Sequence, residues 1–235
     1  MVSIAEMLKN TDPTLPPVIV YGGGGHGKTL IEAIQVGQEF QVLGVIDDGL
    51  PVGMQLLGVP VLGGEGLLPE LLDHGVTMAV NGVGGIGNPD ARWHVFELLQ
   101  KAGFNFPTII HPTAYLEPSA KVTAGVQVLG MAYVGTQVNI GFGSVVNIGA
   151  ILPHDCQIGQ CVNLSPGVML AGNVSIADFS QVGMGATINL NIMVGEHVRI
   201  GNNATIKSDV PDRTVVRAGT IWPLPLLDHL GTLEE

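Results

Sequence analysis

The chain has few basic residues and few cysteines for its length. Its 235 residues include nine Lys and Arg against 20 Asp and Glu, which gives a formal net charge of −11. A nucleic-acid partner would require a basic face, so we expect none. The two cysteines, Cys156 and Cys161, cannot form a disulfide framework, and a reducing cytoplasmic location is predicted.

Long apolar runs are missing as well. No window has the length of a membrane span. The stretch from Met1 to Pro17 contains Glu6, Asp12 and several prolines rather than the apolar centre of a signal peptide. Glycine is abundant, with 34 residues, whereas charged residues make up only 12% of the chain. This composition favours an ordered fold with many short turns over a disordered acidic chain.

The second half of the sequence contains a six-residue repeat. Seventeen consecutive positions, taken every six residues from Ile110 to Ile206, are all Ile, Leu or Val. A second column, four residues later, stays small or β-branched from Ala114 to Val210. A period of six fits neither an α-helix nor a hairpin strand, but it fits the short flat faces of a parallel β-helix. We expect the glycines at turn positions to provide positive φ angles: Gly135, Gly141, Gly159, Gly183, Gly195 and Gly201.

This repeat resembles that of the hexapeptide-repeat transferases, which fold as a left-handed triangular prism. The resemblance implies that three hexads make one coil, and Ala204–Pro211 is similar to the closing turn of that family. Seventeen hexads then make between five and six coils. It also implies an acyltransferase that uses acyl-CoA and assembles as a homotrimer.

The first half reads as a small α/β domain. Strands are predicted at Pro17–Tyr21, Val42–Ile46, Val76–Val80 and Phe106–Ile109, with one helix through Ile31 and Ile34 and another at Pro89–Lys101. Glycines 22, 24 and 27 match the dinucleotide-binding pattern, and an acidic residue follows about 20 positions later. However, the unit is short for the two mononucleotide-binding halves that NAD spans.

The order of motifs adds a second resemblance, which covers Val18 to Val216. A Gly-rich loop with His-Gly-Lys, an Ile-Asp-Asp segment, and a His-Pro-Thr-Ala entry to the repeat are similar to the sialic-acid-type sugar O-acyltransferases and the nucleotide-amino-sugar N-acetyltransferases. In these enzymes the small domain binds a nucleotide sugar. Helix N-termini and backbone N–H groups suit a diphosphate, and carboxylates can accept hydrogen bonds from a base or ribose. The predicted substrate-binding residues are Gly24, Gly25, His26, Gly27, Lys28, Asp47 and Asp48. A plain solvated turn remains the alternative for the two aspartates.

These observations divide the chain into four parts. We expect an N-terminal arm at 1–16, a Rossmann-like nucleotide-sugar domain at 17–109, a left-handed β-helix that binds acetyl-CoA at 110–211, and a C-terminal tail at 212–235. The segment from Arg217 to Pro223 departs from the usual C-terminal sequence of the family.

His154 is the predicted general base. The segment Ala150–Cys156 resembles the catalytic His-(Glu/Asp)-Cys segment of the family. A neutral imidazole can take the proton of an attacking amine or hydroxyl, and Asp155 can orient the ring. An exposed turn histidine is the alternative. Cys156 falls in the small-residue column, so a structural role is predicted and transfer should be direct.

Three further residues follow from coil stacking and the family pattern. Because a coil is three hexads long, Gly172 lies one coil beyond His154, where its N–H can serve the thioester carbonyl, as the matching glycine does in the family. Asn147 matches a family asparagine near the acetyl group, although it can equally stabilise its own turn. Asn163 stands where some members carry a second histidine.

The sequence therefore predicts an acetyl-CoA-dependent N-acetyltransferase for a nucleotide-linked sugar, most simply a UDP-4-amino-4,6-dideoxy sugar. O-acetylation of a sialic-acid-type sugar and a non-catalytic sugar-nucleotide scaffold are the alternatives. No metal site is predicted, because His111, His154 and His197 occupy different hexad positions and cannot converge on zinc.

Overall fold

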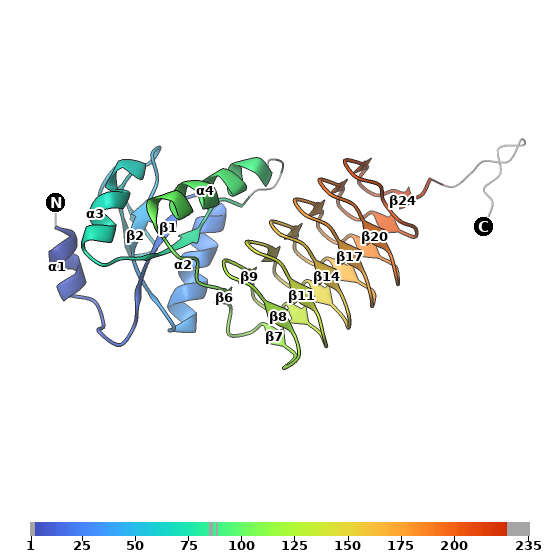
Figure 1. The fold of residues 1–235 in the computed structure, drawn as a ribbon, viewed down its shortest axis with the longest axis horizontal. Coiled ribbons are helices and arrows are strands. Elements are labelled where there is room, and N and C mark those ends of the chain that lie inside the picture. Colours follow the sequence, from blue (N-terminus) through green and yellow to red (C-terminus); the bar gives the residue numbers. More distant parts are fainter. Residues whose placement is uncertain (1–2, 85–86, 88, 225–235) are drawn as a thin grey trace, which may run out of the picture. The chain divides into compact units, whose positions relative to one another are not determined.

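The computed structural model describes residues 3–84, 87 and 89–224 and divides into two compact units. The first unit runs from Met1 to Pro112 and the second from Thr113 to Glu235. Figure 1 labels their elements. No helix in the described ranges has the length and apolar content needed to cross a membrane.

The first unit is built on a five-stranded sheet in the order β3-β4-β2-β1-β5. All neighbours are parallel except β3 and β4, which form an antiparallel pair. The strands are β1 (Pro17–Tyr21), β2 (Gln41–Ile46), β3 (Gln55–Leu56), β4 (Val59–Gly63) and β5 (Met78–Asn81). Because β2 and β5 lie on opposite sides of β1, the strand order reverses at β1, and ligands of open α/β sheets bind at the carboxyl edge beside such a point.

Helices cover both faces of this sheet. They are α1 (Ile4–Lys9), α2 (Gly25–Gly37), the 3₁₀ turn η1 (Glu65–Leu67), α3 (Leu68–Asp73) and α4 (Pro89–Ala102). Alternate residues of a strand point to opposite faces. Accordingly, Ile19 and Tyr21 pack in one core with Leu71 of α3 and Leu99 of α4, whereas Val20 lies on the face covered by α2.

Most of the predicted elements of this unit are confirmed, with shifted ends. The strand at Pro17–Tyr21 is reproduced, and the helix predicted at Pro89–Lys101 extends to Ala102. The expected exit strand at 106–109 is instead β6 (Ile109–Ile110). The hairpin of β3 and β4, and the helices α1 and α3, were not predicted. The segments of β3, α1 and α3 are too short to show a clear hydrophobic period, and β4 contains Pro60, which counts against a strand.

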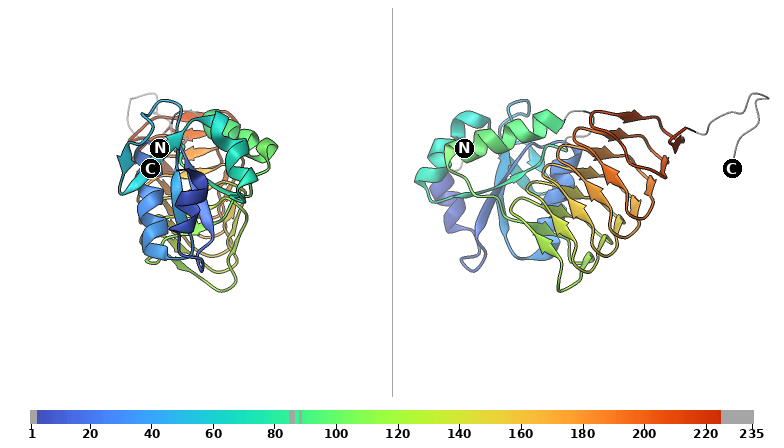
Figure 2. Two further views of the ribbon diagram at one scale, coloured as in Figure 1. Left: turned by 90° about the vertical axis from the view of Figure 1, so that its left-hand side faces the viewer. Right: turned by 45° about the vertical axis from the view of Figure 1, so that its right-hand side comes forward.

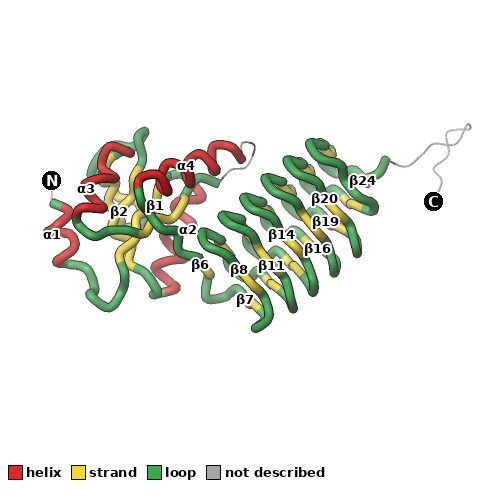
Figure 3. The backbone as a smooth tube through the Cα atoms, viewed as in Figure 1, coloured by secondary structure: helices red, strands yellow, loops and turns green. Residues whose placement is uncertain are grey.

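The second unit is the predicted parallel β-helix. Strands of two residues recur every six residues and stack on three faces, visible as short strands between turns in Figure 3. The first face contains β7 (Tyr115–Leu116), β10 (Tyr133–Val134), β13 (Ile151–Leu152), β16 (Met169–Leu170), β19 (Thr187–Ile188), β22 (Thr205–Ile206) and β24 (Ile221–Trp222). The second face contains β8 (Lys121–Val122), β11 (Asn139–Ile140), β14 (Gln157–Ile158), β17 (Ser175–Ile176) and β20 (Met193–Val194). The third face contains β9 (Gln127–Val128), β12 (Val145–Val146), β15 (Asn163–Leu164), β18 (Gln181–Val182), β21 (Arg199–Ile200) and β23 (Val215–Val216).

Successive coils are in register, each three hexads after the one before. Tyr133 pairs with Ile151, and Ile151 pairs with Met169. The predicted inner column is buried from Val128 to Ile206, and the column of small residues at the bends is buried with it. Figure 2 shows the stacked coils from two further directions. The repeat therefore specifies which residues are neighbours along each edge of the prism.

The expectation that six turn glycines supply positive φ angles is wrong. None of the six is among the described residues with positive φ, which instead include Asp155 and Asn173. A Cβ on Gly141 would lie 2.5–2.8 Å from backbone atoms of Gly159 and Gln160, and the other five would meet the next coil in the same way. These glycines are needed because the backbones of adjacent coils approach too closely for a side chain.

Candidate active site

His154 and Asp155 form an exposed corner between β13 and β14. The second turn residue, Asp155, has a φ of 62°, a left-handed conformation that aspartate tolerates better than most residues. Its carboxylate Oδ2 lies 2.8 Å from Nδ1 of His154, and the two side chains are 60% (His154) and 48% (Asp155) exposed. An ionised carboxylate only accepts, so Nδ1 is the donor and Nε2 carries the lone pair that can take a proton.

Gly172 occupies the same corner one coil further on, as the register of three hexads per coil predicts. Asn173 N–H donates to His154 O at 3.0 Å, which ties the two corners together. A Cβ at Gly172 would overlap the imidazole of His154, so only glycine leaves room for the ring. Gly172 is itself buried beside that ring.

The N–H of Gly172 lacks the side-chain cap that some other corners of the prism have. Gln160 N–H is capped by Asp178 at 2.8 Å and Met184 N–H by Asn202 at 2.9 Å, each from the following coil. The residue following Gly172 by one coil is Leu190, which has no side-chain acceptor, and within the described ranges the Gly172 N–H donates to no protein group. Because Gly172 is a buried residue beside the imidazole, its free donor is a feature of functional interest.

Asn147 lies at another corner of the prism, and Asn163 lies on its third face. The Asn147 side-chain Oδ1 accepts from Ile148 N–H at 2.8 Å, which stabilises its own corner between β12 and β13. Asn163 begins β15 on the third face and is 5% exposed. Within one chain, neither residue is brought to the corner of His154.

Cys156 is buried directly below this corner. Its Sγ lies 3.4 Å from Ala171 O, and burial raises the pKa of the thiol above its usual value. A buried thiol with a raised pKa is a poor nucleophile, which agrees with the structural role predicted for this residue.

In the first unit, the Gly-rich loop leads into α2. Gly24 is the N-cap and Gly25 the first helical residue, and a Cβ at either position would meet no atom within 4 Å. Gly27 packs against Gly22 O, which brings the helix close to β1. His26 is half-buried and Lys28 exposed in the first helical turn. The open backbone at a helix N-terminus is suited to bind an anion.

Asp47 and Asp48 already accept hydrogen bonds from the protein. Asp47 accepts from Gly23 N–H at 2.8 Å and from Gly49 N–H at 2.9 Å, so it orders the Gly-rich loop. Asp48 accepts from the Tyr21 hydroxyl at 3.2 Å and from Glu65 N–H at 3.0 Å. Burial and the Asp48 charge raise the pKa of Tyr21 to about 12.

The sequence analysis missed a second loop at this edge of the sheet. Tyr21 pairs with Asn81, so β1 and β5 end together, and Gly82 N–H donates to Tyr21 O at 2.7 Å. A Cβ at Gly84 would lie 3.4 Å from the Cβ of His26. The glycine-rich run after the third predicted strand could have revealed this loop. In the structure the run begins beside β1, where the strand order reverses.

Comparisons with known proteins agree with both units. The family model described as the PglD N-terminal domain matches residues 17–99. The GDP-perosamine N-acetyltransferase of Escherichia coli O157:H7 is 29% identical over 204 residues, which cover 84% of this chain and 80% of that protein.

Solved structures extend the match. A histidine-to-alanine mutant of GDP-perosamine N-acetyltransferase from Caulobacter crescentus, in complex with CoA and GDP-perosamine, has a TM-score of 0.81 at 29% identity and covers 86% of this chain and 93% of that one. The acetyltransferase domain of PglB from Neisseria gonorrhoeae, in complex with acetyl coenzyme A, has a TM-score of 0.78 at 31% identity and covers 88% and 98%. With this identity over nearly the whole PglB domain, the chain belongs to the hexapeptide-repeat acyltransferases that join a PglD-type N-terminal domain to a left-handed parallel β-helix.

Proposed function

We propose that this protein is an acetyl-CoA-dependent N-acetyltransferase that acts on a nucleotide-linked amino sugar. The observation that carries the proposal is the exposed His154–Asp155 pair, whose imidazole packs against the buried Gly172. A scaffold without chemistry has no need of an oriented imidazole beside a donor that lacks an acceptor. The relatives that bind CoA or acetyl-CoA, one of them together with GDP-perosamine, support the same activity.

The proposed reaction is a direct transfer. The sugar amine attacks the thioester carbonyl while Nε2 of His154 takes the proton that the nitrogen loses. Asp155 holds the ring through Nδ1 and stabilises the imidazolium that forms. The Gly172 N–H stabilises the negative oxygen of the tetrahedral intermediate. When that intermediate collapses, the C–S bond breaks, and the imidazolium returns its proton to the sulfur, which leaves as CoA.

The nucleotide sugar is assigned to the loop edge of the first unit. The N–H groups at the start of α2, from Gly25 to Gly27, would hold the diphosphate. Asp47 contributes by ordering Gly23. Each of its carboxylate oxygens has a further lone pair that can accept a hydrogen bond from a ribose or a base.

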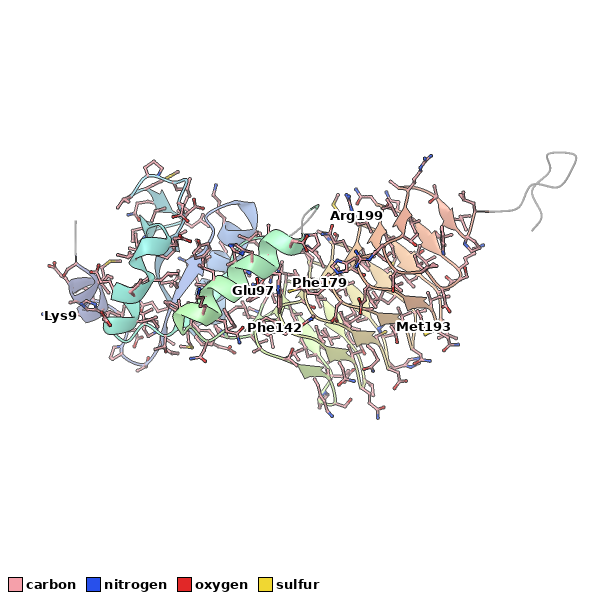
Figure 4. All side chains as sticks on the ribbon, turned by 45° about the horizontal axis from the view of Figure 1, so that its top comes forward. Lys9, Glu97, Phe142, Phe179, Met193 and Arg199 are labelled. Carbon is pink, nitrogen blue, oxygen red and sulfur yellow. The ribbon has the colours of Figure 1, made fainter. Side chains whose placement is uncertain are left out.

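We also propose a homotrimer that is formed through the first face of the β-helix. Its outward side chains are largely apolar, with Tyr115 58%, Ile151 41% and Met169 45% exposed. The second face is polar apart from Met193, labelled in Figure 4. Exposed apolar surface of this extent marks an interface, and a cyclic trimer would bury it in every subunit. Light scattering at micromolar concentration tests this, and a monomer would contradict it.

The decisive experiment is a CoA-release assay with a panel of acceptors. GDP- and UDP-linked amino sugars are compared with the matching hydroxyl sugars and with free sialic acid. The sequence suggested a UDP-linked acceptor, whereas two relatives are named for GDP-perosamine, so both bases are included. Turnover restricted to amino sugars supports N-acetylation. Turnover with hydroxyl acceptors favours the O-acetyltransferase, and no turnover with any acceptor favours the scaffold.

A further inference from the structure

Arg92 is a buried cation in the first turn of α4, the helix marked by Glu97 in Figure 4. It is 2% exposed, and its guanidinium lies 5.2 Å from the centre of the Phe96 ring. Burying a charge costs free energy, and a cation near a helix N-terminus opposes the helix dipole. The helix dipole therefore gives no reason for an arginine here, whereas the hydrogen bonds of its guanidinium do.

The guanidinium binds the loop that follows β5. Its Nη1 donates to Val83 O at 2.6 Å and to Asn81 O at 3.3 Å. Asn81, 1% exposed, donates from its side-chain amide to Arg92 O at 2.9 Å and accepts from Val83 N–H at 3.0 Å. The Val83 N–H is thus bound by the Asn81 side chain and the Val83 carbonyl by the Arg92 side chain. Each of these two buried side chains also donates to the backbone carbonyl of the other residue.

Val83 in turn lies against the Gly-rich loop. A Cβ on Gly22 would stand 3.2 Å from Val83 Cγ2, and one on Gly82 would stand 2.5 Å from Gly22 O. His26 is in near contact with Gly84 across the same junction. With this backbone-to-backbone packing, a displacement of Val83 would displace the Gly-rich loop as well.

We propose that Arg92 and Asn81 are positioning residues that hold the loop Gly82–Gly84 against the Gly-rich loop and thereby set the affinity for the nucleotide. The inference rests on the proposed function, since it assigns the nucleotide to this edge. Neither residue touches the nucleotide in this scheme. They act by keeping the N–H groups of the Gly-rich loop in one arrangement. If the loop adopts that arrangement for only a fraction of the time, the affinity for the nucleotide falls in proportion to that fraction.

The test compares Arg92→Met, Arg92→Lys and Asn81→Leu with Leu99→Val, a control on α4. Leu99 is fully buried in the helix core and makes none of the polar contacts to the loop. Calorimetry gives the Kd for GDP, UDP and acetyl-CoA, kinetics gives KM and kcat, and hydrogen exchange follows the amides of residues 22–27 and 82–84 without ligand. All measurements are made well below each variant's melting temperature.

Arg92→Met and Asn81→Leu should weaken nucleotide binding by about 10- to 100-fold, since each removes hydrogen bonds of a charged or buried group. KM for the nucleotide sugar should rise with kcat little changed, and exchange in both loops should accelerate. Nucleotide affinity of Arg92→Lys should lie between those of the wild type and Arg92→Met. The lysine ammonium keeps the charge but lacks the planar guanidinium that donates two hydrogen bonds in fixed directions. Leu99→Val should lower the melting temperature without these effects.

Equal loss of affinity for nucleotide and acetyl-CoA, or a Leu99→Val variant that behaves like Arg92→Met, would reduce both residues to a general structural role and overturn the inference. If the wild type binds neither GDP nor UDP, the proposed function fails at this site and the affinity part of the inference fails with it. Hydrogen exchange would then show by itself whether Arg92 holds the two loops. Failure of the proposed function is therefore distinguishable from failure of the positioning role.

Discussion

The two units of this protein assemble their candidate sites by different routes. In the β-helix, residues one coil apart are neighbours, so His154 meets Gly172 through a fixed offset of three hexads. In the N-terminal unit, Gly22 meets Val83 only because the sheet places β5 beside β1. A repeat thus encodes its site locally, whereas an open α/β sheet encodes it through strand order. Changes in the first unit should affect nucleotide binding, and changes in the second should affect chemistry.

The largest expected effect tests the chemistry of the β-helix. His154→Ala and His154→Asn should lower kcat by about 10²–10⁴-fold, the usual contribution of a positioned general base. Affinity for GDP or UDP should be unchanged, because we propose that these nucleotides bind the N-terminal unit. His197→Ala, on a different corner where the ring stacks on Phe179, is the control. Near-normal turnover of His154→Asn would exclude the general-base role.

Replacing one glycine in each unit sharpens the structural contrast. Gly141→Ala should destabilise the protein by about 1–3 kcal/mol, because the new Cβ would press on the backbone of the next coil. Gly37→Ala, at the end of α2 with open space around it, should be neutral or slightly stabilising. Denaturant unfolding of both variants measures the difference. Similar free energies of unfolding would mean that the coils can separate enough to admit a methyl group.

Asp47→Ala tests nucleotide binding by the N-terminal unit. The variant loses the acceptor for Gly23 N–H and Gly49 N–H, so the Kd for the nucleotide should rise about tenfold. The Kd for acetyl-CoA should stay constant. Asp48→Ala, which releases Tyr21 and Glu65 rather than Gly23, should have a weaker effect on the nucleotide. Calorimetry on both ligands decides, and an unchanged nucleotide Kd in Asp47→Ala would reduce the aspartate to a plain turn residue.

The smallest expected effect concerns alkaline stability. The pKa of Tyr21 is raised from 10.0 to about 12, so the folded state retains a proton that the unfolded chain loses. Its contribution to stability is therefore complete below pH 10 and disappears as the pH rises toward 12. Tyr21→Phe should show a smaller decrease in the free energy of unfolding over this interval. The buried Cys156 titrates in the same direction in both proteins, so the difference between them isolates Tyr21. Parallel curves would contradict the shift.

Much of the β-helix could be predicted from its sequence. The inner column and the short flat faces were predicted from the repeat, the three hexads per coil from the family resemblance, and all three are confirmed. The structural reason for the six turn glycines could not be predicted. Glycine is required both where two backbones approach closely and where φ is positive, so the sequence does not distinguish the two cases. In the N-terminal unit, β1, β2 and α4 were predicted from their hydrophobic pattern, but the short β3, β4 and α3 were not.

The sequence by itself determined the six-residue repeat, and its resemblance to the hexapeptide-repeat family, which implies three hexads per coil, predicted that His154 and Gly172 are adjacent. Only the tertiary structure decided that the imidazole lies against the glycine, that Asp47 binds Gly23, and that Arg92 and Asn81 hold the loop after β5. These contacts join segments distant in the chain, and their geometry depends on strand order and side-chain hydrogen bonds, which no local periodicity records.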